Sequence, residues 1–409
     1  MKILTFTSLF PNGARPELGV FIYQRTRHIA ELPHTTVEVV APIPYWPEWL
    51  PSSRWSAYGT IGRQETFGGL TTWHPRYPLL PMISMPFHGL LMFLGALGTA
   101  RRLHRRFVFD CIDAHYVYPD GHAAVLLGKF LGIPVIVSAR GTDINVFPSF
   151  ALIRPLIRWT LQQASGLIAV SGALKDRMVQ AGAARENIRV IPNGVDISRF
   201  GAMDRDEARR SLGIPTPGAV ILSVGSLVHV KRQEALIEAV AQIVAQMPEV
   251  RAYIVGEGPR LAELEELVRK ANMERNFFLV GGKPNAELHR WFSAADVSCL
   301  VSAREGWPNV VMESLACGTP VVATAVGGIP EIITSTELGL LVAAEPASIA
   351  QGISHALKTK WDREKLVQYA RSRSWDVVAE EVEEYLSTVT KMTAEKTSRP
   401  FFGKNKRDV

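Results

Sequence analysis

The sequence predicts an α/β protein with two doubly wound domains, each built on a largely parallel sheet. Strand-like apolar runs alternate with helical patterns along the 409 residues, as expected for a succession of βαβ units. The runs fall into two sets, separated by the turn-rich segment Asn193-Gly194-Val195-Asp196. Apolar residues make up 47% of the chain and charged residues 21%, which is typical of a globular protein with a large core.

The strands are predicted in order along the chain. In the first domain, residues 1–195, they cover 3–7, 37–43, 108–115, 134–140, 166–171 and 189–192. In the second domain, residues 196–374, they cover 220–226, 251–256, 277–281, 297–302, 320–325 and 339–343. A helix is expected over 375–391, and the polar, basic residues 393–409 are expected to be disordered. Ligands of such sheets bind outside the carboxyl ends of the strands.

Charge and cysteine content exclude several classes of protein. The net charge is +6, but residues 391–409 hold much of the excess, so the body is nearly neutral and no nucleic-acid partner is expected. Cys111, Cys299 and Cys317 lie in apolar runs without metal-ligand spacing, which predicts buried thiols and a cytoplasmic protein. The N-terminal apolar run is too short for a signal peptide. The run 89–100 is too short for a bilayer, which needs about 20 residues.

The segment 304–314 carries the strongest functional signal. It follows a predicted strand, passes through a Gly-x-Pro turn, and enters a helix expected over 310–316, with Pro308 in its first turn. The backbone N–H groups of residues 306–310 are expected to be free, and with the helix dipole they form an anion site. Glu305 and Glu313 flank this site. Carboxylates beside an anion site suit a nucleotide sugar, which is part phosphate and part polyol.

This pattern resembles glycosyltransferase family 4, whose members are retaining enzymes with the GT-B fold. The resemblance implies two Rossmann-like domains facing each other across a cleft, with the C-terminal helix crossing back to the first domain. It also implies that Glu305 binds hydroxyls of the donor sugar and that Glu313 binds the ribose. The alternative interpretation is a surface loop and an amphipathic helix with two solvated glutamates. The loop residues implied to bind the donor with Glu313 are Gly306, Trp307, Pro308, Asn309 and Val310.

A second donor segment opens the second domain. The strand 220–226 is followed by a loop, and a helix is expected to start near Lys231. A lysine at that place reaches a diphosphate and neutralises the charge that develops on the leaving phosphate. The family usually has an arginine where Ser226 stands, so one expected phosphate contact is missing. Whether Arg232 compensates is left open. The alternative for both basic residues is a solvated helix end.

Further glycine-rich loops match the family in order. Val255-Gly256-Glu257-Gly258 follows a strand, but Leu261 stands where a third glycine would be, which argues against a dinucleotide site. The resemblance implies that these loops line the nucleotide pocket and that Gly19 approaches the donor phosphates. The residues implied to bind the donor from these loops are Gly19, Gly225, Gly256, Glu257, Gly281 and Lys283.

Three polar residues follow strands of the first domain. His115 ends the strand 108–115, where it is either a donor-sugar contact or a satisfied structural residue. Arg140 ends the strand 134–140 and Asp143 follows it. Both are implied to bind the acceptor, although the family commonly has histidine in place of Arg140. With Glu305 and Lys231, His115 completes the predicted catalytic set. No cofactor beyond the nucleotide-sugar substrate is expected.

No metal ion is expected either. Asp204-Arg205-Asp206 matches a metal motif of a different transferase fold, yet it precedes a predicted helix. Acidic residues in the first turn complement the helix dipole, and that explains the motif better.

The segment 43–106 suggests contact with a membrane. It holds Trp46, Trp49, Trp55 and Trp73, then an apolar run, then Arg101, Arg102, Arg105 and Arg106. Aromatic and arginine side chains suit a membrane interface. The alternative is a loop packed over a helix with a solvated basic end.

The sequence therefore predicts a metal-independent, retaining glycosyltransferase that uses a nucleotide-diphosphate sugar and a lipid-linked or glycan acceptor. It is expected in the cytoplasm, with possible peripheral contact to the membrane. Two alternatives are a nucleotide-sugar epimerase of the same architecture, which needs no acceptor, and a catalytically silent binding subunit. Sugar, base and acceptor are not specified by the sequence.

Overall fold

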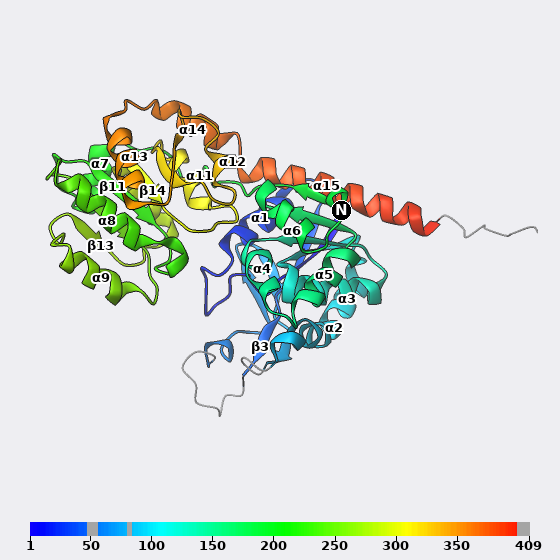
Figure 1. Cartoon of the computed structure of the whole chain (residues 1–409). Coiled ribbons are helices and arrows are strands. Elements are labelled where there is room, and N and C mark those ends of the chain that lie inside the picture. The colour runs from blue at the N-terminus through cyan, green and yellow to red at the C-terminus, as the bar shows by residue number, and fades with distance from the viewer. Residues whose placement is uncertain (47–55, 80–83, 399–409) are drawn as a thin grey trace, which may run out of the picture. The chain divides into compact units, whose positions relative to one another are not determined.

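The computed structural model describes residues 1–46, 56–79 and 84–398, and it divides into two compact units (Figure 1). Unit 1 comprises residues 1–170, 175–191 and the chain from Ala379 onward, and unit 2 comprises residues 171–174 and 192–378. Trp49 and Trp55 lie outside the described residues.

Unit 1 is built on an eight-stranded sheet with the order β10-β9-β8-β7-β1-β2-β5-β4. All its pairs are parallel except β4 with β5, and β3 pairs with β6 separately. The strands are β1 (Lys2–Phe6), β2 (Thr36–Val40), β3 (Ile43–Tyr45), β4 (Gln64–Phe67), β5 (Leu70–Trp73), β6 (Arg76–Pro78), β7 (Cys111–His115), β8 (Val135–Ala139), β9 (Gly166–Ala169) and β10 (Ile188–Val190). The main helices are α1 (Val20–Glu31), α2 (His88–Phe107), α3 (His122–Leu131), α4 (Thr142–Asn145), α5 (Arg154–Gln163) and α6 (Gly172–Gln180), of which α6 belongs to this unit from residue 175 onward.

Unit 2 has a six-stranded parallel sheet with the order β13-β12-β11-β14-β15-β16. Its strands are β11 (Val220–Val224), β12 (Arg251–Val255), β13 (Phe277–Leu279), β14 (Val297–Leu300), β15 (Val321–Thr324) and β16 (Gly339–Val342). Its helices are α7 (Arg205–Leu212), α8 (Gln233–Val244), α9 (Leu261–Lys270), α10 (Leu288–Ala294), α11 (Asn309–Ala316), α12 (Ile329–Ile332), α13 (Pro346–Lys358) and α14 (Arg363–Arg371).

Both faces of the unit 2 sheet are buried. Along β11, Val220 and Leu222 pack into one hydrophobic cluster and Ile221 into another, because successive side chains of a strand point to opposite faces. Helices cover both faces, and this explains why the strands of this unit are continuous apolar runs. Cys111, Cys299 and Cys317 are buried free thiols, as predicted.

The structure corrects the prediction between residues 43 and 87, where a long connection was expected. The hairpin of β4 and β5 turns through Gly68 and Gly69, both at positive φ, and adds an edge to the sheet. The strand predicted from 108 begins only at Cys111, because Val108 closes α2 through its N–H bond to the carbonyl oxygen of His104 at 2.8 Å.

The last helix, α15 (Trp375–Ser398), extends into the segment that was expected to be disordered from residue 393. Residues such as Ala394, Glu395 and Lys396 favour helix and continue the pattern. From Ala379 onward α15 belongs to unit 1, where the Tyr385 hydroxyl accepts from the Leu167 N–H at 3.2 Å and donates to the Asn187 carbonyl at 3.0 Å. Among the described residues, no helix is both long and apolar enough to cross a bilayer.

Candidate functional site

The site in unit 2 forms where the strand order reverses. β11 and β14 are neighbours in the sheet, but the chain proceeds from β11 toward one edge and from β14 toward the other. The loops after these two strands therefore separate on opposite sides and leave room for a ligand between them. Lys231 follows β11 and Glu305 follows β14.

Lys231 and Glu305 meet at this point. The Lys231 Nζ donates to Glu305 Oε1 at 2.6 Å, and the Ser302 hydroxyl donates to the same oxygen at 2.6 Å. The side chains of Lys231 and Glu305 are 21% and 11% exposed, so this ion pair is largely shielded from water. The Ala303 N–H also donates to the carbonyl oxygen of Val230 at 2.8 Å, which ties the two loops together. Two of the three predicted catalytic residues thus form one cluster, and Ser302 is a member that sequence analysis missed.

Glycines allow the loops to pack closely around this cluster. A Cβ at Gly256 would lie 2.0 Å from the carbonyl oxygen of Gly225, so only glycine fits there. A Cβ at Gly327, whose φ is +56°, would lie 2.0 Å from the carbonyl oxygen of Glu305. The Gly256 N–H donates to the Gly281 carbonyl at 3.0 Å. The loops after β11, β12 and β13 are thereby joined backbone to backbone.

The helix after Glu305 leaves backbone donors free, as the sequence predicts. α11 starts at Asn309, and Pro308 is its N-cap rather than a residue of its first turn. The N–H groups at the following positions donate to no acceptor within the described part of the chain: Gly306, Trp307, Asn309 and Val310. Clustered free N–H groups at a helix start attract anions.

Glu313 lies in the second turn of α11 and is partly buried. Burial raises its pKa to about 7, although the nearby Arg199 opposes the shift. A carboxylate kept away from water in this way gains from hydrogen-bond donors such as ligand hydroxyls. Upstream on the same helix, Asn309 accepts from the Asn193 side-chain amide at 3.1 Å, while Trp307 packs against the hydrophobic core.

The segment around Lys231 differs from its prediction in the type of helix that holds the lysine and in the residue at which the following α-helix starts. Lys231 lies in the short 3-10 helix His229–Lys231, and α8 starts only at Gln233, because Arg232 has a left-handed backbone with φ of 52°. Arg232 donates to the Ala344 carbonyl at 2.9 Å, and Ser226 is exposed. Glu257 is exposed and Lys283 partly buried in neighbouring loops. Their roles stay predictions.

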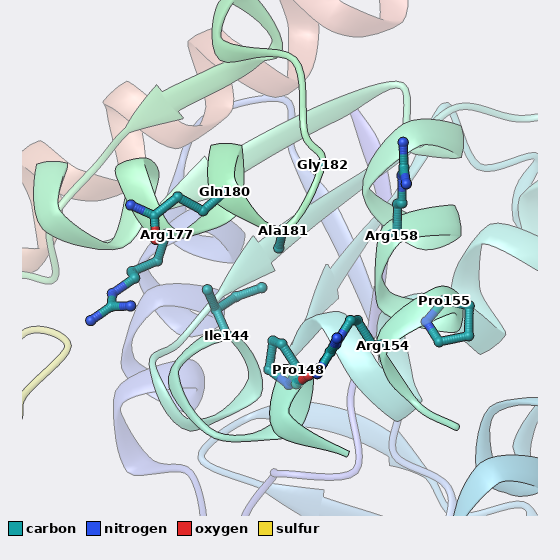
Figure 2. A pocket seen from close by; sticks show the side chains of 9 residues that line it. All are labelled: Ile144, Pro148, Arg154, Pro155, Arg158, Arg177, Gln180, Ala181 and Gly182. Atoms are coloured by element: carbon teal, nitrogen blue, oxygen red, sulfur yellow. Dashed lines mark hydrogen bonds between the residues drawn. The ribbon is translucent and has the colours of Figure 1, made fainter. Parts of the chain in front are cut away.

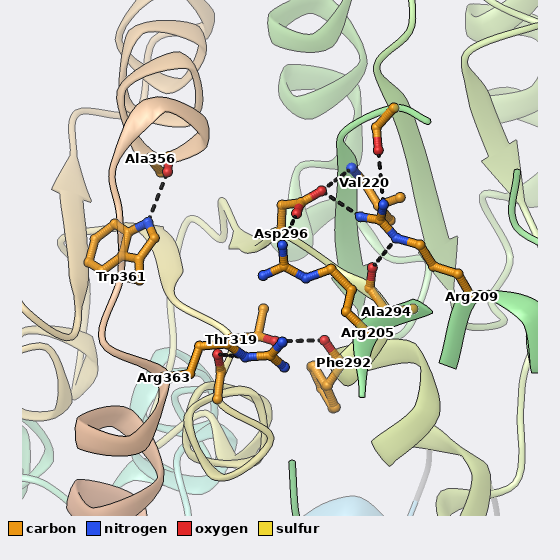
Figure 3. A network of polar contacts seen from close by, with 12 residues as sticks. Arg205, Arg209, Val220, Phe292, Ala294, Asp296, Thr319, Ala356, Trp361 and Arg363 are labelled. Atoms are coloured by element: carbon orange, nitrogen blue, oxygen red, sulfur yellow. Dashed lines mark hydrogen bonds and ion pairs between the residues drawn. The ribbon is translucent and has the colours of Figure 1, made fainter. Parts of the chain in front are cut away.

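The acidic motif at residues 204–206 starts a helix, which confirms the interpretation from sequence. The Asp204 side chain accepts from the Glu207 N–H at 2.9 Å as the N-cap of α7. Figure 3 shows Arg205 and Arg209 converging on Asp296, each at 2.7 Å. This network joins α7 to the start of β14 and gives the motif a structural role. No metal-ligand cluster of His, Cys, Asp or Glu occurs among the described residues.

A buried ionic network occupies the strand ends of unit 1. Arg25 binds both oxygens of Asp113, at 2.9 and 3.0 Å, and His115 Nε2 lies 3.2 Å from Asp113. Burial opposes ionisation of Asp113, but Arg25 and His115 hold its pKa well below its usual range. Burial also lowers the pKa of His115 to about 3, so its neutral ring accepts from Arg140 through Nδ1. His115 is fully buried, and its role as a donor contact stays a prediction.

Asp143 and Gly19 have clear structural partners. The Asp143 carboxylate is buried and accepts the N–H groups of Val117, Arg140 and Gly141 at 2.8, 3.1 and 2.8 Å. Burial still raises its pKa. Gly19 begins α1 at a φ of 65°, and a Cβ there would lie 2.1 Å from the Leu9 carbonyl oxygen. These contacts shape the loops, and the predicted ligand contacts stay untested.

Asp120 is a buried carboxylate that sequence analysis missed. Its Oδ1 accepts from the Ser8 N–H, which joins the segments after β1 and β7. Burial raises its pKa to about 7. Its place in Tyr118-Pro119-Asp120-Gly121, just after a strand end, was the available signal.

Comparison with known proteins identifies the family. The model described as Glycosyltransferase Family 4 matches residues 19–199, and the model described as Glycosyl transferases group 1 matches residues 204–373. TuaC of Bacillus subtilis, a glycosyltransferase named for teichuronic acid biosynthesis, is 26% identical over 90% of each chain. The D-inositol 3-phosphate glycosyltransferase of Actinosynnema mirum is 31% identical over 73% of this chain and 79% of its own.

The fold is also matched by solved structures. HepE of Anabaena, in complex with UDP, superposes with a TM-score of 0.73 at 20% identity. The match covers 95% of this chain and 100% of the HepE chain. The two parallel α/β units and this match show the GT-B fold. The family matches and the curated relatives show that the chain is a glycosyltransferase and belongs to glycosyltransferase family 4.

Proposed function

We propose that this glycosyltransferase transfers a sugar, with retention of configuration and without a metal ion, from a nucleotide-diphosphate sugar to a lipid-linked or polysaccharide acceptor. The observation that carries the proposal is the pairing of Lys231 with Glu305 beside four free N–H groups, those of Gly306, Trp307, Asn309 and Val310. The Lys231 ammonium group and the free N–H groups can bind the diphosphate, and the Glu305 carboxylate can accept hydrogen bonds from the hydroxyl groups of a sugar.

Charge on the leaving group is the main chemical demand on the donor site. When the bond between the anomeric carbon and the phosphate oxygen breaks, negative charge develops on the phosphate. Lys231 and the N-terminus of α11 supply positive potential that is in place before the reaction, so little reorganisation is needed. This supports catalysis without a bound cation.

Retention is proposed because the sequence resembles the retaining enzymes of glycosyltransferase family 4. Front-face attack is proposed because, among the described residues, no second carboxylate of this site is assigned as a nucleophile. Glu305 already accepts from Lys231 and Ser302, and its expected ligands are sugar hydroxyls. The acceptor hydroxyl then attacks the face that the phosphate leaves, its proton passes to the departing phosphate oxygen, and the transition state resembles an oxocarbenium ion. One glycosidic bond forms as the sugar–phosphate bond breaks.

The relatives favour transfer over the two alternatives. Each curated relative described above is named as a glycosyltransferase, and one is named for an inositol phosphate acceptor. An epimerase would release a free sugar without acceptor, and a silent subunit would bind the donor without turnover. Incubation of the purified protein with a panel of nucleotide sugars, with and without membrane extract, separates the three. Acceptor-dependent transfer is expected, and sugar release that is independent of extract would contradict it.

The acceptor is proposed to be presented at the cytoplasmic face of a membrane, because α2 carries a mixed apolar and basic stripe. Phe87, Leu90 and Leu94 are 60%, 45% and 56% exposed, and Arg101 and Arg105 continue the same stripe at helical spacing. Met92, Ala96 and Leu103 on the other side of the helix are buried. Apolar side chains beside arginines suit the headgroup region of an anionic bilayer.

Each arginine near anionic lipid contributes about 1 kcal/mol, an attraction that salt screens. Reversible binding to phosphatidylserine vesicles is therefore expected at low salt in co-sedimentation. Replacement of Arg101, Arg102, Arg105 and Arg106 by Gln should release the protein without changing nucleotide affinity. Wild-type protein that stays in the supernatant at low salt would overturn the proposed membrane contact, but not the transferase.

A further inference from the structure

A pocket of about 660 Å³ opens in unit 1, apart from the ionic network of His115 and Arg140. Its volume is within the range of small-molecule sites. Figure 2 shows Arg177 and Arg158 projecting from opposite sides of the pocket, with Ile144 and Ala181 between them. The lining residues that bear on its chemistry are Ile144, Pro148, Arg154, Arg158, Arg177 and Gln180.

The charge of the pocket lining is entirely positive. It contains Arg154, Arg158 and Arg177 and no carboxylate. Arg154 donates through Nε to the Pro148 carbonyl at 2.7 Å, which leaves the outer nitrogens of its guanidinium for another partner. No ion pair joins any of the three to a carboxylate in the part of the chain that the structure describes. Asp176, the neighbour of Arg177, is paired with Arg185 instead at 2.6 Å.

This arrangement opposes the stability of α5. Arg154 and Arg158 are four residues apart on that helix, and like charges at this spacing repel. Arg154 is also the first residue of α5, where the helix dipole is positive and no acidic residue lies in the first turn. An anion bound beside Arg154 and Arg158 reduces the repulsion between these two charges.

We infer that this pocket binds the carboxylate or phosphate group of an acidic saccharide, as part of the acceptor. Guanidinium groups bind both anions through paired hydrogen bonds. Gln180 adds a polar contact for hydroxyls, and Ile144 and Pro148 offer apolar surface to the C–H face of a sugar ring. The inference that the saccharide is the acceptor rests on the proposed function, and Ile144 directly follows Asp143, a predicted acceptor residue.

Calorimetry on the full chain tests the site with three probes. These are a glucuronate-containing tetrasaccharide, the same tetrasaccharide with its carboxyl groups reduced, and glucose 6-phosphate. We expect the acidic tetrasaccharide to bind at least tenfold more tightly than its reduced form, with an affinity that falls as salt rises. Stronger binding of glucose 6-phosphate than of the tetrasaccharide would assign the pocket to phosphate, and the reverse would assign it to carboxylate.

Paired substitutions locate the binding. A double variant with Arg154→Gln and Arg177→Gln should bind the acidic tetrasaccharide more weakly, with an affinity lowered roughly tenfold or more for each guanidinium lost. Arg210→Gln with Arg275→Gln, at exposed positions of unit 2, removes the same charge and should leave the affinity unchanged. Equal affinity for the acidic and reduced tetrasaccharides, or equal losses in both paired variants, would overturn the inference.

The outcomes also distinguish this inference from the proposed function. Arginine-dependent binding without any sugar transfer would retain the anion site and reject the transfer reaction proposed above. Transfer to an acidic acceptor that is unaffected in the Arg154/Arg177 variant would retain the transferase and reject the pocket.

Discussion

Replacement of Glu313 by glutamine should stabilise unit 2 at neutral and alkaline pH while weakening nucleotide binding. Burial raises the pKa of Glu313 to about 7, from 4.5 in the unfolded chain. A raised carboxyl pKa means that the folded state is favoured below the unfolded pKa and loses this advantage as pH rises through the folded value. Glutamine keeps the shape of the protonated acid and cannot ionise.

The size of the effect follows from the shift. A shift of roughly 2.5 units at about 1.36 kcal/mol per unit corresponds to ~3 kcal/mol, reached above pH ~8. At pH 5 the same relation gives less than about 1 kcal/mol, because this pH lies only about half a unit above the unfolded pKa of 4.5, so the unfolded chain has gained little from ionisation while the folded state stays protonated. The gain of the variant should therefore grow steadily from pH 5 to pH 8.

Differential scanning calorimetry at pH 5, 6, 7 and 8.5 measures this gain, and a nucleotide titration measures the loss of affinity. Glu265→Gln, an exposed change on α9, is the control for removal of one charge. A stability difference that is the same at pH 5 and pH 8.5 would refute the reasoning, since it would not arise from ionisation. Unchanged nucleotide affinity would remove Glu313 from the ribose site.

Other predictions concern the same loops. Lys231→Ala should lower kcat by roughly 2.7–4 kcal/mol of transition-state stabilisation, and wild-type turnover would show that another group faces the phosphate. Glu305→Ala should reduce turnover far more than nucleotide affinity, which steady-state kinetics with a nucleotide titration separates. Activity should persist in excess EDTA, and its recovery by added manganese after a loss would contradict the metal-free proposal. Gly256→Ala should lower the free energy of unfolding by about 1–3 kcal/mol, whereas Gly201→Ala, with no atom within 4 Å of the new Cβ, should not.

Much of the architecture could be predicted because buried parallel strands are continuous apolar runs. The strands of unit 2 were predicted to within a residue or two, since β11, β12 and β14 have no polar face. The edge hairpin was missed because β4, with residues such as Gln64 and Glu65, has no buried residue and only a weak apolar pattern. The Gly68-Gly69 turn was the signal that could have revealed it.

The candidate site was predictable in part. Glu305 and Lys231 could be chosen because each follows a strand end, and the sheet order brings these ends together. Their pairing through one carboxylate oxygen was not predictable, because it depends on how two loops 74 positions apart pack. Arg25 gave no signal at all. It lies inside an ordinary helix pattern, and only the folded unit shows that it neutralises Asp113.

The division of α15 between the two units affects the order in which the two units can finish folding during synthesis. Unit 1 contains the start of the chain, yet it needs Val382, Leu386 and Val389, which are buried against it near the other end. Unit 2 has all its residues by Val378. Domains usually fold in the order in which they leave the ribosome. Here the unit that is made first must wait for the last helix, so the later unit is the first that can finish folding.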